Sequence, residues 1–119
     1  MVYEEVIFPT TFAFLAEQSG QFLRLYMAPG VGHCAGGVGP SSFGQLGLHT
    51  AKGSKYGLAD ALESWVEKGT APGEITATKY SGTTVLITRP LCAYPEAPKY
   101  NGTGDANDSA SFTCASPDR

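Results

Sequence analysis

One histidine lies in a glycine-rich segment that directly follows a short apolar run. The run, residues 22–28, alternates bulky apolar side chains with an arginine and a tyrosine, which predicts a β-strand. Pro29 cannot donate to a sheet ladder, so it ends the strand. Five glycines follow within residues 30–39, and they permit tight turns around His33. We therefore expect His33 on a loop just beyond a strand end, where catalytic groups collect in open α/β sheets.

Histidine at such a position suits general-base chemistry, because an unperturbed imidazole titrates near neutral pH. Most single histidines do no chemistry, however, and spacing alone favours an ordinary loop residue. The second histidine, His49, falls in a long polar loop over residues 40–57, where solvent exposure is the main expectation and substrate contact the minor one. A metal site built from His33, Cys34 and His49 is weaker still, since no close ligand spacing supports it.

The residues around His33 resemble a segment of a known enzyme family. Met27–Gly37 is similar to the histidine segment of the tannase and feruloyl esterase family, whose members are secreted serine esterases of the α/β-hydrolase type. The resemblance implies that His33 is the base of a serine–histidine–aspartate triad. It also implies that Cys34 forms a disulfide with a cysteine outside this chain, next to the nucleophilic serine.

The similarity continues through the rest of the sequence. It includes Trp65–Pro72, Arg89–Pro95 and the tail Tyr100–Cys114, so it covers nearly the whole chain in order. The implied activity is that of a carboxylic ester hydrolase acting on aromatic (phenolic) esters, such as feruloyl or galloyl esters. The choice between gallate and ferulate stays open.

Only part of the implied triad is present. In α/β hydrolases the order is serine, acid, histidine, but no G-x-S-x-G and no Cys-Ser pair occurs in these 119 residues. Ser19 is the sole serine before His33, and it does not match the nucleophile motif. We therefore expect residues 1–119 to be a C-terminal fragment of a single α/β-hydrolase catalytic domain, inactive by itself. The alternatives are a non-catalytic secreted module for binding or packing, and a truncated gene product.

The three cysteines form an odd set. Under the resemblance, Cys34 is the odd one and Cys92 pairs with Cys114, a link that stabilises by roughly 3 kcal/mol. The alternative is three reduced cytosolic thiols. Sequons at Asn101 and Asn107 weigh against that alternative, because N-glycosylation marks secreted proteins.

Composition limits the partners. A net charge of −3 gives no support for nucleic-acid binding, and no apolar run reaches the ~18 residues of a membrane span. No signal peptide is visible after Met1. The expected partners are a small-molecule or polysaccharide-linked phenolic ester and the remainder of the parent catalytic domain. The resemblance implies no cofactor in this chain; in the family calcium is commonly bound in a lid region that lies outside these residues. It also implies that the parent is secreted.

The expected fold class is α/β, the C-terminal part of an α/β-hydrolase fold that is incomplete on its own. It should contain one parallel strand, the histidine loop, a helix, a β-hairpin and a tail held by the disulfide. A helix is expected within residues 2–18, interrupted at Pro9. Apolar spacing predicts a second helix over residues 58–68, with Trp65 in the core and Gly69 at its end. Residues 74–80 and 84–89 predict a hairpin.

Overall fold

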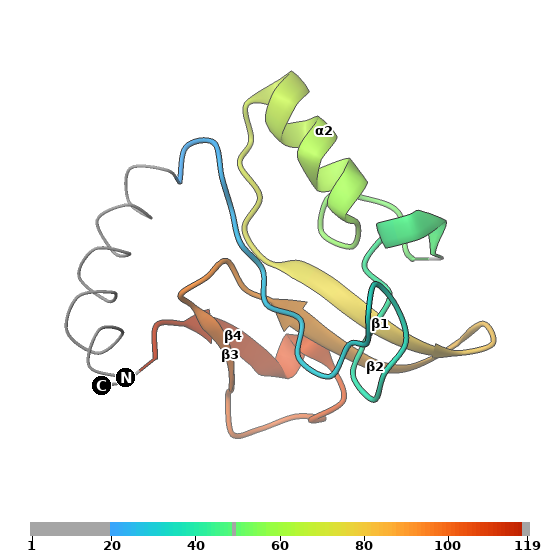
Figure 1. The fold of residues 1–119 in the computed structure, drawn as a ribbon. Coiled ribbons are helices and arrows are strands. Elements are labelled where there is room, and N and C mark those ends of the chain that lie inside the picture. Colours follow the sequence, from blue (N-terminus) through green and yellow to red (C-terminus); the bar gives the residue numbers. More distant parts are fainter. Residues whose placement is uncertain (1–19, 49, 118–119) are drawn as a thin grey trace, which may run out of the picture.

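The computed structural model describes residues 20–48 and 50–117, so the helix expected within residues 2–18 and His49 lie outside the described residues. The described part holds one α-helix, α2 (Leu58–Lys68), and four short strands. The strands form two antiparallel pairs, β1 with β2 and β3 with β4 (Figure 1). No described helix is long and apolar enough to cross a membrane.

The predicted hairpin is present and longer than expected. β1 (Ile75–Ser81) pairs with β2 (Thr84–Leu91) in antiparallel register. We expected Arg89-Pro90 to end the second strand, and this was wrong, because Pro90 lies opposite Thr76 inside the ladder. A proline is tolerated there since no other named strand pairs with β2.

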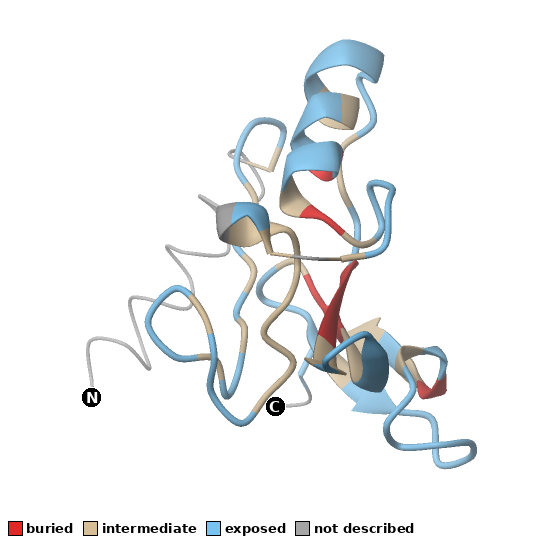
Figure 2. Cartoon of the chain, turned by 90° about the vertical axis from the view of Figure 1, so that its right-hand side faces the viewer, coloured by how far each residue is buried: buried red, intermediate tan, exposed pale blue. Residues whose placement is uncertain are grey.

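β1 carries the centre of the fold. On the side away from β2, Ser42 and Thr78 exchange two backbone hydrogen bonds of 2.9 and 2.8 Å, so the edge of β1 is covered. Ile75 and Ala77 are buried together with Ala61 of α2 and Leu91 of β2, and Figure 2 shows this buried band along β1. The threonines that alternate with them are buried as well, so β1 has no solvent-facing side along its first half.

α2 has the predicted bounds but not the predicted packing. Gly69 ends it in the left-handed conformation, and its N–H donates to the carbonyl of Trp65 at 3.1 Å. Of the apolar face, only Ala61 is buried, while Leu62 and Val66 are 59% and 77% exposed. Trp65 was expected in the core but is only half-buried, because α2 contributes only Ala61 to the buried cluster.

The predicted strand over residues 22–28 is also corrected. Only Tyr26 pairs, in an isolated antiparallel bridge with Ala93, and no parallel strand occurs in the described residues. The physical reason is that no strand of the described residues runs alongside this segment to form hydrogen bonds with its backbone. Its side chains still alternate. Arg24 and Tyr26 point inward, where they donate to the carbonyl of Pro72 at 2.7 and 3.1 Å.

The C-terminal part is held by a disulfide. Cys92 and Cys114 are bonded, with Cα atoms 5.7 Å apart, as the resemblance implied. Cys114 lies in β4 (Phe112–Ala115), which pairs with β3 (Ala97–Tyr100). The link therefore ties the small β3–β4 sheet to the end of β2.

Candidate functional site

The glycine-rich segment forms a closed loop over residues 30–39. Two backbone hydrogen bonds, Gly32 N–H to Gly36 at 2.9 Å and Gly39 N–H to Gly30 at 2.8 Å, hold its two legs together. The legs are so close that a Cβ at Gly37 would lie 2.2 Å from the carbonyl oxygen of Gly30. Glycine is thus required there by space as well as by its φ of +100°.

His33 and Cys34 lie at the tip of this loop. Both are exposed, and the Cys34 Sγ is 3.5 Å from the Nδ1 of His33. Within the described residues nothing bonds to the Nε2 atom, so this nitrogen is open to an incoming group. Neither ring nitrogen contacts a hydroxyl or a carboxylate of the described chain. An imidazole in this setting can accept a proton from an incoming group.

Two side chains tether the loop to the rest of the fold. The Lys79 ammonium, on β1, donates to the carbonyl of Val38 at 2.9 Å. The Gln45 amide, in a short 3-10 helix (Gln45–Gly47), donates to the carbonyl of Cys34 at 3.3 Å. One tether therefore acts on the second leg of the loop and the other acts directly beside His33.

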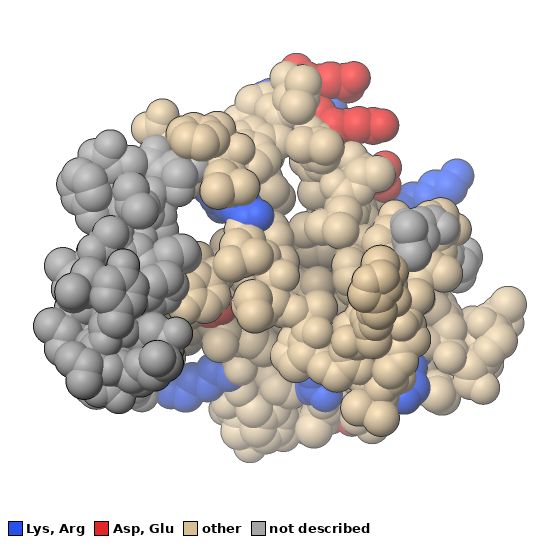
Figure 3. Space-filling view, viewed as in Figure 1, with Lys and Arg blue, Asp and Glu red and all other residues tan. Residues whose placement is uncertain are grey.

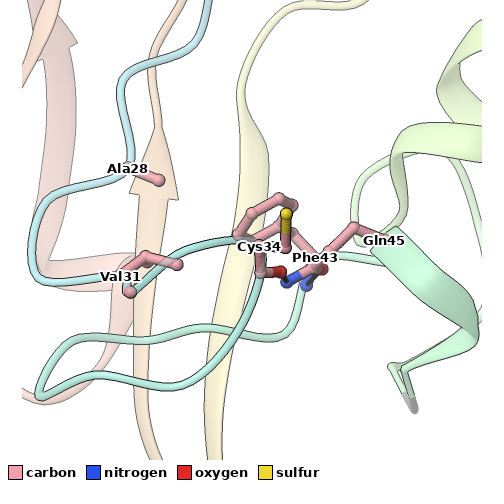
Figure 4. Close-up of a pocket in the computed structure, with 6 residues that line it drawn as sticks. Ala28, Val31, Cys34, Phe43 and Gln45 are labelled. Carbon is pink, nitrogen blue, oxygen red and sulfur yellow. Dashed lines mark hydrogen bonds between the residues drawn. The ribbon is translucent and has the colours of Figure 1, made fainter.

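A pocket opens next to the loop tip. Its volume is about 390 Å³, and its lining is largely apolar. The residues that form it come from the end of the 22–28 segment, from the glycine loop and from the segment after it: Ala28, Val31, Gly32, Cys34, Phe43 and Gln45 (Figure 4). Such a cavity suits a flat apolar group better than a charged one.

On the face seen in Figure 3, most of the visible carboxylates lie over α2. Asp60, Glu63 and Glu67 are the exposed acidic residues of that helix, as expected of a solvated face. The one resolved pKa change in the described residues is at Tyr26, where burial raises the pKa of the phenol and the nearby Arg24 partly opposes the rise.

The structure keeps the other predicted site residues apart from His33. Asn101 and Asn107 are exposed on the loop after β3, and the Cys92–Cys114 disulfide is attached to the β3–β4 sheet through Cys114 of β4. No group of three potential metal ligands occurs in the described residues. The metal site considered for His33, Cys34 and His49 is not tested by this, because His49 lies outside the described residues.

Sequence reasoning missed Gln45, Phe43 and Lys79. Gln45 and Phe43 reach the tip of the histidine loop only because the chain after the loop turns back onto Cys34, and no spacing pattern in the sequence predicts this turn. The guanidinium of Arg24 donates to the Pro72 carbonyl and lies over the ring of Trp65, 5.7 Å from its centroid.

Comparison with known proteins places these residues in context. The family model for tannase and feruloyl esterase matches residues 4–115. An uncharacterised esterase of Xanthomonas campestris pv. campestris is 42% identical over 86% of this chain and 19% of its own length. A mono(2-hydroxyethyl) terephthalate hydrolase of Piscinibacter sakaiensis is 41% identical over 81% of this chain and 14% of its own length. A probable feruloyl esterase of Arthroderma benhamiae is 47% identical over 79% and 16%, respectively.

Solved structures agree with the sequence matches. An esterase from Aspergillus oryzae superposes with a TM-score of 0.77 at 30% identity, and feruloyl esterase B from the same organism does so with 0.77 at 28%. Each match covers 90% of this chain and 23% of the solved one. The chain thus spans less than a quarter of the length of these relatives.

Proposed function

Because this chain belongs to the tannase and feruloyl esterase family, we propose that it supplies the histidine base of a carboxylic ester hydrolase of the α/β-hydrolase type. The observation that carries the proposal is the placement of His33. Its imidazole stands at the tip of a closed loop, beside an apolar pocket, with Nε2 open. A base needs a rigid support and an accessible lone pair, and this loop offers both.

In the proposed reaction a serine hydroxyl from polypeptide outside these residues attacks the ester carbonyl, and His33 takes its proton. The tetrahedral intermediate collapses, the alcohol leaves with that proton, and an acyl-enzyme remains. His33 then deprotonates a water molecule, which attacks the acyl-enzyme and releases the carboxylic acid and the serine. An aspartate, also from outside these residues, holds the imidazole in the required tautomer.

Cys34 has a proposed role in the same centre. Its thiol is exposed and, unlike Cys92 and Cys114, has no disulfide partner in the described residues. A bridge from Cys34 to a cysteine beside the nucleophile would hold the two catalytic loops at a constant separation. The exposure of Cys34 supports this proposal because a bridge to another segment needs an accessible sulfur.

We further propose that residues 1–119 form the C-terminal part of a single catalytic domain and that the remainder of the domain packs on them. Leu23, Leu25 and Met27 are 61%, 49% and 59% exposed and point to the side opposite Arg24 and Tyr26. A row of three large apolar side chains costs free energy in water unless other polypeptide covers it. The small share of each relative that the chain spans supports the same proposal.

The proposed substrates are esters of aromatic, phenolic acids. The relatives named above include feruloyl esterases and a terephthalate ester hydrolase, and the acids in these names are aromatic. The apolar pocket with Phe43 beside the loop tip supports an aromatic acyl group. The alternative, a non-catalytic module, would bind sugars by stacking them on exposed tyrosines such as Tyr100. It is less favoured, because the hydroxyl of Tyr100 donates to the Gly104 carbonyl and its ring packs on Phe112.

Secretion and glycosylation are proposed together. The Cys92–Cys114 disulfide favours an oxidising compartment, and Asn101 and Asn107 are exposed in a turn-rich loop that an oligosaccharyltransferase could reach. Material secreted from a eukaryotic host should therefore lose two glycans on treatment with a peptide N-glycosidase, as read by mass spectrometry. Unmodified asparagine at both positions would contradict the glycosylation.

The role of His33 is tested in the full polypeptide in which these residues occur. His33→Ala should lower kcat on a methyl ferulate or gallate ester by about 10³-fold or more, because the triad loses its base, while the circular dichroism spectrum stays unchanged. His49→Ala is the matched control and should keep activity within about twofold. Near wild-type turnover of the His33 variant would refute the proposal.

The isolated chain should show no turnover on the same esters. Robust hydrolysis by residues 1–119 alone would mean that another catalytic group lies within them.

A further inference from the structure

A specific contact holds the tip of the histidine loop in place, and its importance for catalysis rests on the proposed function of His33. Cys34 has a φ of 68°, the left-handed conformation, although it is not a glycine. Side chains other than glycine adopt this conformation at a cost, and they keep it only where the surroundings enforce it. Some contact must therefore hold the peptide that follows His33.

Gln45 makes that contact. Its Nε2 donates to the Cys34 carbonyl at 3.3 Å and also to the Ser41 carbonyl, while its Oε1 accepts the Phe43 N–H at 3.0 Å. Both donors and the acceptor of the amide are thus used, all on backbone groups. Figure 4 shows Cys34, Phe43 and Gln45 gathered at one side of the pocket.

The direction of the amide is set by its partners. Two carbonyl oxygens can only accept, so the nitrogen must face them, and the oxygen must face the N–H of Phe43. A carboxylate in the same place would put an anionic oxygen against two carbonyl oxygens. Glutamate at position 45 would therefore keep the shape of the side chain but reverse the interaction.

We propose that Gln45 is a positioning residue for the reaction: it clamps the peptide of Cys34 and thereby fixes the direction of the His33 imidazole. Gln45 acts through backbone groups, so its effect falls on the step that needs the aligned base and not on substrate binding. Gln45 also lines the pocket, but the hydrogen-bonding atoms of its amide are all used on backbone groups, so none is left for a substrate.

The test compares Gln45→Met and Gln45→Glu with the control Gln21→Met in the full polypeptide that carries these residues. Gln21 is exposed and has no hydrogen bond described, so its loss removes a glutamine without removing a tether. We expect kcat on an aromatic ester to fall at least about tenfold in both Gln45 variants, with KM within about twofold, because a displaced base slows the chemical step. The control should match the wild type.

The outcomes separate the possible roles. A raised KM at unchanged kcat would overturn the proposal, since Gln45 would then contact the substrate. An unchanged kcat with a lower melting temperature, or failure of both Gln45 variants to fold, would also overturn it, since the role would be structural only. His33→Ala, assayed in parallel, keeps the two proposals apart. If it stays active the base assignment fails, whereas an inactive His33 variant with an active Gln45→Met refutes only the clamp.

Discussion

Two neighbouring glycines of the histidine loop allow the geometry of the site to be tested with a single methyl group. Gly36 and Gly37 both have positive φ, of +70° and +100°. An alanine at either position must adopt a left-handed backbone, which lowers the free energy of unfolding by about 1–2 kcal/mol. They differ in the space around them. A Cβ at Gly36 meets nothing within 4 Å, whereas a Cβ at Gly37 would lie 2.2 Å from the carbonyl oxygen of Gly30 and 2.8 Å from the nitrogen of Gly32.

The magnitude follows from these distances. Ordinary contact needs about 3.4 Å, so the two legs of the loop must separate by about 1 Å in Gly37→Ala. A displacement of that size at a catalytic group costs about 10²-fold in rate. We therefore expect Gly37→Ala to lower kcat/KM about a hundredfold. Gly36→Ala should lower the free energy of unfolding by about 1–2 kcal/mol while leaving kcat/KM within about threefold.

The assay is ester hydrolysis by the full polypeptide, with the melting temperature measured for each variant. Equal activity of the two variants would refute the reasoning, because it would mean that the closed loop does not position His33. Two-dimensional amide spectra of the full polypeptide give an independent check. Shifts should spread through residues 30–39 in Gly37→Ala and stay local in Gly36→Ala.

Three further predictions concern stability and surfaces. Replacing both Cys92 and Cys114 by alanine should lower the free energy of unfolding by about 3 kcal/mol, since the disulfide closes a loop with a sequence separation of 22. Urea unfolding measures this loss, and a loss below about 1 kcal/mol would contradict the prediction. Burial raises the pKa of Tyr26 in the folded state, so the phenol of the unfolded state ionises first and the free energy of unfolding falls as the pH rises above 10. Tyr26→Phe should reduce this alkaline loss of stability, measured by unfolding at a series of pH values. Identical pH profiles of the variant and the wild type would argue against it. The double variant Leu23→Lys and Leu25→Lys should reduce self-association of the isolated chain in size-exclusion chromatography but lower the melting temperature of the full polypeptide. If neither the self-association nor the melting temperature changes, the rest of the polypeptide does not cover this apolar row.

Local signals in the sequence predicted the regular elements well. The spacing of Leu58, Ala61 and Trp65 predicted α2, and Gly69 marked its end because a left-handed C-cap favours glycine. The β-rich runs around Gly82 predicted the hairpin for a comparable reason, since the turn and its flanking strands are encoded within a few residues. The family motif likewise singled out His33 and the Cys92–Cys114 pair.

The errors all concern contacts between distant segments. Residues 22–28 have the composition of a strand, yet a strand needs a neighbouring ladder, and the described chain supplies only the bridge between Tyr26 and Ala93. The apolar face of α2 predicted a buried Trp65, but the amount of partner surface that reaches a helix is not written in its spacing. Pro90 stays in β2 because of what lies beside that strand, again a property of the assembled fold.

By itself the sequence determined the bounds of α2 and the position of the hairpin turn, and it marked one histidine in a glycine-rich loop. Those features depend on steric and hydrogen-bonding preferences over a few consecutive residues. The tertiary structure decided that Gln45 and Lys79 hold that loop, that Phe43 lines the pocket beside it, and that Leu23, Leu25 and Met27 remain uncovered. Such contacts depend on which surfaces meet after the chain has folded, so no short pattern can encode them.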